Sequence, residues 1–157
     1  MRLYIKQKIF SWVDKFTVKE KSGADRYSVH GEFLSWGKTL HICNSHGEEV
    51  ALVQQKVFSF LPRFYVFVGG RQVAEIVKEF TFFKPRYRIE GLGWVMDGDF
   101  FAHDYTITAN GSPIVSISKA WMTWGDCYEL NIWDTKDEVV ALAVVLAIDC
   151  VLAQSNN

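Results

Sequence analysis

The chain has 157 residues, of which 49% are hydrophobic and 15% aromatic, and its formal net charge at pH 7 is −1. This composition is too apolar for a disordered protein, and the length suits a single domain, residues 1–157, with a sizeable core. The nearly neutral charge excludes a strong overall attraction to nucleic acid, so we expect no nucleic-acid partner.

The N-terminal stretch MRLYIKQKIFSW has charged and polar residues in every apolar run, so it lacks the hydrophobic region of a signal peptide. The three cysteines, Cys43, Cys127 and Cys150, are odd in number, far apart and not arranged as C-x-x-C. This pattern fits neither a disulfide framework nor a zinc site. We therefore expect reduced, mostly buried thiols in a cytoplasmic protein.

Short segments of alternating polarity fill the chain from Arg2 to Trp133, and most of them end at a turn signal. Their β-branched and aromatic residues and their period of two predict about twelve strands. The pair Asn110-Gly111 predicts a tight hairpin, because both residue types tolerate a positive φ. The predicted strands contain the segments LYIKQ, KFTVKE, RYSVHG, TLHICN, EVALVQ, FYVFVG, QVAEIVKE, RYRIEG, WVMDGD, YTITAN, IVSISK and YELNIW.

A smaller unit recurs along these strands: a lysine, an aromatic residue two positions later, and usually another two positions after that. Because alternate side chains of a strand share one face, we interpret the aromatics as core residues with a lysine at the sheet rim. The units are Lys8-Phe10-Trp12, Lys56-Phe58-Phe60, Lys78-Phe80-Phe82 and, more loosely, Lys119-Trp121-Trp124.

The segment KPRYRIEG contains the best candidate for a binding site, formed by Lys84, Arg86 and Arg88. Arg86 and Arg88 share one face of the predicted strand, and Tyr87 takes the opposite face. Two guanidinium groups and an ammonium can hold a phosphate through charge-assisted hydrogen bonds. The alternative is a solubilising surface strand, with these side chains paired to carboxylates such as Glu75, Glu79 or Glu90.

The acidic segment DGDFFAHD, with Asp97, Asp99, His103 and Asp104, is the best sequence match to a metal site, but its spacing fits no calcium loop. We interpret these four residues as solvated turn residues. His41 and His46 flank a predicted turn and could approach each other across it, whereas His30 and His103 have no local partner. Cys127 follows an aspartate, which works against a reactive thiolate, so we assign it to packing.

Residues 137–154 form the most apolar segment, DEVVALAVVLAIDCVLAQ, and its alanines and leucines favour a helix. A membrane span needs roughly 17–25 apolar residues, whereas residues 139–153 include Asp149. We therefore expect no transmembrane segment. Asp137 or Thr135 is the expected cap of this helix. The expected core positions are Val139, Leu142, Val145, Leu146 and Ile148, with Asp149 near the far end, where it can reach backbone N–H groups or water.

A helix that is apolar on every face is either a membrane span or completely buried, and this one is too short to span. About twelve strands can enclose such a helix, because barrels wider than eight strands leave a lumen. The fold class that follows is mainly β: a closed antiparallel barrel, with strands over residues 2–133, around a C-terminal α-helix.

Several long segments closely resemble the LURP-one-related family. They are KQKIFSWVDKFTVK, QQKVFSFLPRFYVFVGGRQVAEIVKEFTFFKPRYRIEG, GDFFAHDYTI, ISKAWMTWGDCYELNIWD and AVVLAIDCVLA. The family shares the tubby C-terminal-like fold with the phospholipid scramblases, so the resemblance implies a twelve-stranded barrel around a hydrophobic helix. For function the resemblance implies little: tubby proteins bind phosphoinositide headgroups through basic residues and scramblases are tied to membranes and calcium, but many LURP-one-related proteins have no assigned activity.

The sequence favours a non-enzymatic binding module whose ligand is an anionic headgroup or another protein. One alternative is an enzyme that uses a histidine and aspartate site, and a weaker one is a scramblase-like membrane lipid protein. We find no D-x-[DN]-x-[DN]-G calcium loop and no cysteine cluster for palmitoylation, and we expect no cofactor. The expected localisation is cytoplasmic, with peripheral contact to a membrane.

Overall fold

The computed structural model describes residues 1–6, 15–34 and 37–155. Within these residues, twelve strands are followed by a short 3-10 helix and one α-helix. The strands are β1 (Arg2–Lys6), β2 (Lys15–Lys19), β3 (Asp25–Leu34), β4 (Gly37–Asn44), β5 (Glu49–Gln55), β6 (Arg63–Val68), β7 (Arg71–Glu79), β8 (Arg86–Glu90), β9 (Trp94–Asp99), β10 (Asp104–Ala109), β11 (Ser112–Met122) and β12 (Gly125–Ile132). The helices are η2 (Thr135–Asp137) and α1 (Glu138–Ser155).

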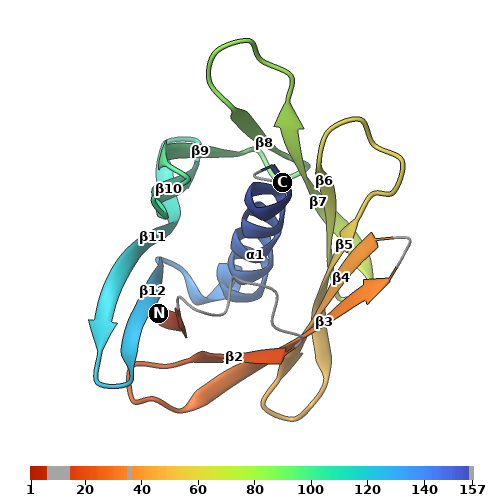
Figure 1. Cartoon of the computed structure of the whole chain (residues 1–157). Helices are drawn as coiled ribbons and strands as arrows, with labels where there is room; N and C mark the ends of the chain where they lie inside the picture. Colours follow the sequence, from red (N-terminus) through yellow and green to blue (C-terminus); the bar gives the residue numbers. More distant parts are fainter. Residues whose placement is uncertain (7–14, 35–36, 156–157) are drawn as a thin grey trace.

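The strands form one antiparallel sheet that curls into a nearly closed barrel (Figure 1). The first strand pairs with the last strand, with Leu3 opposite Leu130, so β12 closes back on β1 within the sheet. Hydrogen bonding is interrupted between β8 and β9, which are the two ends of the sheet order. Tyr87 of β8 packs edge-on against Phe100 beside β9, with ring centroids 5.9 Å apart, so aromatic side chains fill this junction. The predicted mainly β barrel is confirmed.

The tight hairpin predicted at Asn110-Gly111 is also confirmed. Asn110 has a φ of 50° and Gly111 a φ of 79°, which is the conformation that a two-residue turn between β10 and β11 requires. The strands β10 and β11 pair through Ala109 and Ser112 on either side of it.

Helix α1 occupies the interior of the barrel (Figure 1), which confirms the expected plug. Every residue from Ala141 to Ile148 is buried, and the predicted core positions Leu142, Val145, Leu146 and Ile148 belong to the hydrophobic core. Val139 is partly buried against the same core. No helix within residues 1–6, 15–34 and 37–155 is long and apolar enough to cross a bilayer.

A buried ionic cluster fixes the start of α1 to β3. Glu138 is 4% exposed and accepts hydrogen bonds from the Arg26 guanidinium and from the Tyr27 hydroxyl, the latter at 2.7 Å. Burial, and then the hydrogen bond to Glu138, raise the pKa of Tyr27 to about 12. Asp134 accepts the hydrogen bond from the Lys136 backbone N–H that caps η2. Asp137 directly precedes α1, and the cap predicted for α1 itself, Asp137 or Thr135, stays a prediction.

Near the other end of α1, Asp149 pairs with a histidine. The Asp149 Oδ1 lies 2.9 Å from His103 Nε2, and the imidazole stacks on Tyr128 at 4.3 Å. Burial raises the pKa of Asp149, although the hydrogen bond from His103 opposes that shift. The expected backbone or water partner of Asp149 is therefore replaced by His103, and the interpretation of His103 as a solvated turn residue is wrong.

Candidate functional site

The predicted basic strand is β8, and its side chains alternate as expected. Tyr87 and Ile89 are buried, whereas Arg86 and Arg88 point outward. Arg88 is held by two carboxylates: its Nη1 donates to Glu79 at 2.8 Å and its Nε donates to Glu90 at 2.9 Å. The hydrogen bond and charge of Glu90 lead the effects that raise the pKa of Arg88.

Lys84 and Arg86 differ from Arg88 in their surroundings. Both are exposed, and neither side chain forms an ion pair within the part of the chain that the structure describes. The cationic groups available at this end of β8 are therefore Lys84 and Arg86, whereas Arg88 serves mainly to pair with the glutamates of β7 and β8.

A hollow of about 300 Å³ lies at the base of the β7–β8 connection, residues 80–85. Lys78 and Lys84 supply cationic groups to its wall, and Phe80 and Phe83 supply apolar surface. Leu61 of the β5–β6 connection also lines it, so the β5–β6 and β7–β8 loops meet there. The lining residues are Leu61, Lys78, Glu79, Phe80, Thr81, Phe83, Lys84 and Pro85.

The β5–β6 connection, residues 56–62, carries two phenylalanines in solvent. Phe58 is 101% exposed and Phe60 is 91% exposed. Backbone hydrogen bonds hold this loop in place: the Lys56 N–H donates to Arg63 O at 2.9 Å, and the Lys78 N–H donates to Pro62 O at 3.2 Å. The second bond joins the β5–β6 loop to β7 near the end of that strand, so it holds this loop close to the base of the β7–β8 loop.

Exposed phenylalanines gather at one end of the barrel, where α1 ends. Seven of the eleven phenylalanines within the described residues are exposed, and all seven lie in or beside connections from an odd-numbered to an even-numbered strand. In an antiparallel meander these connections share one edge of the sheet. The seven are Phe33, Phe58, Phe60, Phe80, Phe82, Phe83 and Phe101.

Contacts with α1 fix the position of that end. Gln55, at the end of β5, donates a hydrogen bond to Gln154 at 2.9 Å, and His103, in the β9–β10 connection, binds Asp149. Figure 1 shows the β7–β8 loop extending past the C-terminus. The turns of the opposite sheet edge, residues 20–24, 45–48, 69–70, 91–93 and 110–111, contain glycine and no phenylalanine.

The interpretation of the lysine–aromatic units as core aromatics is wrong for the units at Lys56 and Lys78. Lys56 directly follows the last residue of β5 and Lys78 is the residue before the last one of β7, and the aromatics of both units are exposed residues of the following loop. Trp121 is likewise exposed, whereas Trp124 packs edge-on against Tyr4 at 6.2 Å. The unit Lys8-Phe10-Trp12 lies outside the described residues.

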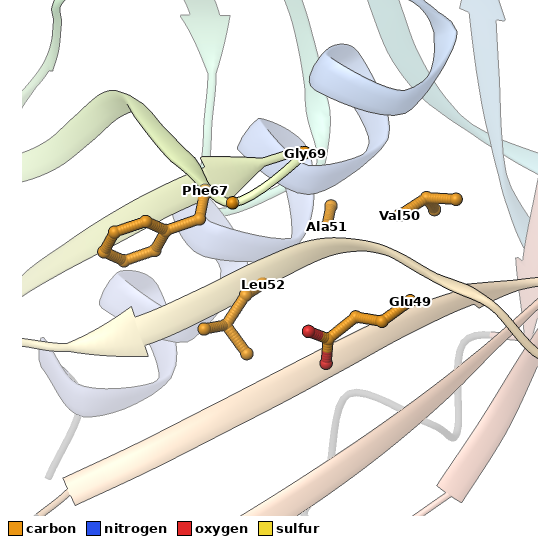
Figure 2. A pocket seen from close by; sticks show the side chains of 7 residues that line it. Glu49, Val50, Ala51, Leu52, Phe67 and Gly69 are labelled. Atoms are coloured by element: carbon orange, nitrogen blue, oxygen red, sulfur yellow. The ribbon is translucent and has the colours of Figure 1, made fainter.

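A second hollow, of about 160 Å³, lies between β5 and the β6–β7 turn (Figure 2). Leu52 and Phe67 form its apolar wall, and Glu49 stands at its side. The Glu49 carboxylate is already engaged by His41 Nδ1 on the neighbouring strand. This hollow is small, Glu49 is the one charged residue in its lining, and the lining offers no converging polar groups for a ligand.

The histidines do not assemble a metal site. His41 binds Glu49 and faces Glu32 at 3.5 Å. Its partners are therefore carboxylates, whereas the predicted turn suggested an approach to His46. His30 lies directly opposite His41 on the adjacent strand. Among the described residues, however, no three histidine, cysteine or acidic side chains converge as metal ligands.

The cysteines behave as predicted from their spacing. All three are free, Cys127 and Cys150 are buried, and Cys43 is partly exposed. Burial raises the pKa of Cys127, and burial raises the pKa of Cys150 to about 12. Neither buried thiol is poised to form the thiolate that nucleophilic catalysis needs, which agrees with the assignment of Cys127 to packing.

Comparisons with known proteins support the fold and the family resemblance. The family model described as LURP-one-related matches residues 1–149. The uncharacterized protein YxjI of Bacillus subtilis (strain 168) is 36% identical over 152 residues, which cover 97% of this chain and 94% of that protein. An X-ray structure of a protein from Arabidopsis thaliana superposes with a TM-score of 0.64 at 12% identity, covering 95% of this chain and 90% of the other.

Proposed function

The chain belongs to the LURP-one-related family, and on this premise we propose that it is a non-enzymatic binding module that docks on anionic membrane surfaces. The docking surface is the end of the barrel where α1 ends. One observation carries the proposal: Lys84 and Arg86 are exposed without ion pairs among the described residues, beside a hollow whose wall adds Lys78.

The chemistry of this surface suits a phosphate-bearing headgroup. The guanidinium of Arg86 can donate two hydrogen bonds to one phosphate, and lysine ammonium groups add charge around it. The nearest carboxylate in the hollow, Glu79, is bonded to Arg88 and therefore opposes an incoming anion less than a free carboxylate would. The whole protein has a net charge of −1, so the attraction is local to this end.

Vesicle co-sedimentation tests the proposal. Wild-type protein should sediment with phosphatidylcholine vesicles that contain phosphatidylserine or a phosphoinositide, and added salt should release it because exposed charges are screened. Each basic side chain near such a surface contributes about 1 kcal/mol, so Lys84→Ala with Arg86→Ala should weaken binding about 30-fold. The melting temperature should hardly change, since exposed charges contribute little to folding.

The matched control is Lys21→Ala with Arg71→Ala. Both residues are exposed at the opposite sheet edge, Lys21 in the β2–β3 turn and Arg71 as the first residue of β7, and the double variant changes the net charge by the same amount. Its vesicle binding should equal that of wild type. Equal losses in the two double variants would mean that charge alone matters and not this surface. A wild-type protein that ignores acidic vesicles at low salt would refute the proposed function and favour a protein ligand.

A further inference from the structure

We propose that the β5–β6 and β7–β8 loops insert their phenylalanines into the bilayer at the boundary between headgroups and acyl chains. This inference rests on the proposed function and adds an orientation to it. The barrel then stands on the membrane with the end of α1 facing the lipid. The inserted side chains are Phe58, Phe60, Phe80, Phe82 and Phe83.

The first support is how little these side chains contribute to the fold. Each exposes two thirds or more of its surface, and Phe83 is 98% exposed. The favourable free energy of burying a phenylalanine is therefore unused in the isolated chain. Large exposed apolar clusters of this kind mark interaction surfaces. Phe80 and Phe82 contact each other edge-on at 5.4 Å, so the exposed rings form a cluster on the β7–β8 loop.

The second support is the backbone at Phe58. This residue has a φ of 61°, the left-handed conformation that is a genuine outlier for a bulky side chain. Glycine or asparagine adopts it at much lower cost. Because the ring contacts solvent, packing of this side chain does not compensate for the strain. Strained residues concentrate at functional sites, and a ring presented at a loop tip is consistent with that pattern.

The third support is the order of residue types along each loop, which matches the layers of a membrane surface. Lys56 stands at the base of one loop, and Lys78 and Lys84 flank the other, while the phenylalanines lie between or beyond them. Aromatic side chains favour the interfacial region of a bilayer, and basic side chains favour the headgroup layer. Each loop therefore presents apolar side chains for the interfacial region and cationic side chains for the headgroup layer of a bilayer.

The shape of the surface favours a fluid bilayer over a folded partner. The five rings belong to two separate loops (Figure 1), and of the five only Phe80 and Phe83 line the hollow at the base of the β7–β8 loop. A folded partner would need a pocket for each ring, whereas lipid chains adapt to any spacing. The cationic groups beside the rings add complementarity to acidic lipids, which an apolar protein groove does not provide.

An environment-sensitive fluorophore on a single cysteine tests insertion in the full-length chain. Cys43→Ser removes the partly exposed thiol, and Phe82→Cys or Ser59→Cys then provides a labelling site on either loop. A nitrobenzoxadiazole label should shift to the blue and brighten when phosphatidylcholine–phosphatidylserine vesicles are added. Asn110→Cys, in a turn of the opposite sheet edge, is the control label and should not change.

The outcomes separate insertion from simple electrostatic docking. Sedimentation with acidic vesicles without a change at the loop labels would overturn insertion and leave the proposed function intact. Absence of sedimentation would overturn both. A label that changes with protein concentration when no vesicles are present would also overturn insertion, because the loops would then be covered by a second copy of the chain.

Two substitutions extend the test to affinity. Phe58→Asn with Phe82→Ser should weaken binding to acidic vesicles on the order of tenfold or more, because two apolar rings no longer enter the interface. The melting temperature should not fall, since both rings are exposed, and Phe58→Asn removes a strained conformation. Unchanged vesicle affinity in this double variant would overturn the inference, and so would a large loss of stability.

Discussion

Shortening Leu146 to alanine tests whether α1 is the core of the barrel. Leu146 is 1% exposed in the middle of the buried run of α1. Removing its three outer carbons costs roughly 0.8 kcal/mol for each buried CH₂ or CH₃ group. A cavity term is added where the walls cannot collapse, and comparable substitutions span about 3–5 kcal/mol. The walls here are hydrogen-bonded strands, so we expect a loss of about 4 kcal/mol in the free energy of unfolding.

Urea unfolding followed by circular dichroism measures this loss. For a chain of this size the slope is about 2 kcal/mol per molar urea, so the midpoint should fall by about 2 M with an unchanged slope. The control is Leu52→Ala on the outer side of β5, where the side chain is only partly buried (Figure 2). That change should cost about 1 kcal/mol. If Leu146→Ala costs no more than Leu52→Ala, the helix is not enclosed and the reasoning fails.

Two further predictions concern ionised groups. Glu138→Ala should cost about 2–3 kcal/mol in urea unfolding, because it leaves the buried Tyr27 hydroxyl without its acceptor and removes a charge-assisted partner of Arg26; a cost below about 0.5 kcal/mol would show that the cluster is not needed. Burial lowers the pKa of His41, but the hydrogen bond and charge of Glu49 outweigh that effect and raise it above 6.5. The pair therefore stabilises the fold fully below pH 6.5, and this contribution to the free energy of unfolding should disappear as the pH rises through the raised pKa of His41. Glu49→Gln should remove that pH dependence of stability. An unchanged pH dependence in this variant would refute the pairing.

The sequence predicted the architecture because two hydrophobic patterns dominate it. Strands alternate with a period of two from Arg2 onward, and residues 137–154 are apolar on every helical face, which leaves burial inside the barrel as the remaining solution. The family resemblance pointed to the same fold. The observed helix, Glu138–Ser155, differs from the prediction by one residue at each end.

The candidate site was predicted less well, for physical reasons. Alternation indicates which face a residue takes only while the strand continues, and the strands β5 and β7 each end within one residue of the lysine of the repeated unit. The aromatics that follow belong to loops, where a period of two has no meaning. The change was signalled by Pro62 and Pro85, which mark loops after each unit. The pairing of Arg88 with Glu79 and Glu90 was among the alternatives that the sequence left open.

The pair formed by His103 and Asp149 could not be found from spacing, because the two residues are 46 positions apart and meet only when α1 enters the barrel. His103 also has a φ of 55°, which no local residue pattern indicated. Long-range contacts of this kind depend on the register of the helix inside the sheet. The sequence contained each residue but not the rotation of α1 that brings them together.

The pairing of β1 with β12 has a consequence for biosynthesis. β1 is synthesised more than a hundred residues before its partner β12, and α1 emerges after both. Strands β1–β8 can therefore pair successively into one curved sheet and β9–β11 into a smaller one, and β12 joins the two by pairing with β1 and β11. The apolar concave face of such a nascent sheet has nothing to cover it until α1 is made. Such a nascent sheet is exposed to aggregation and to chaperone binding, and its folding depends on contacts distant in sequence, which makes closure slow. Because α1 follows all twelve strands along the chain, termination upstream of it would leave the barrel without the helix that fills it.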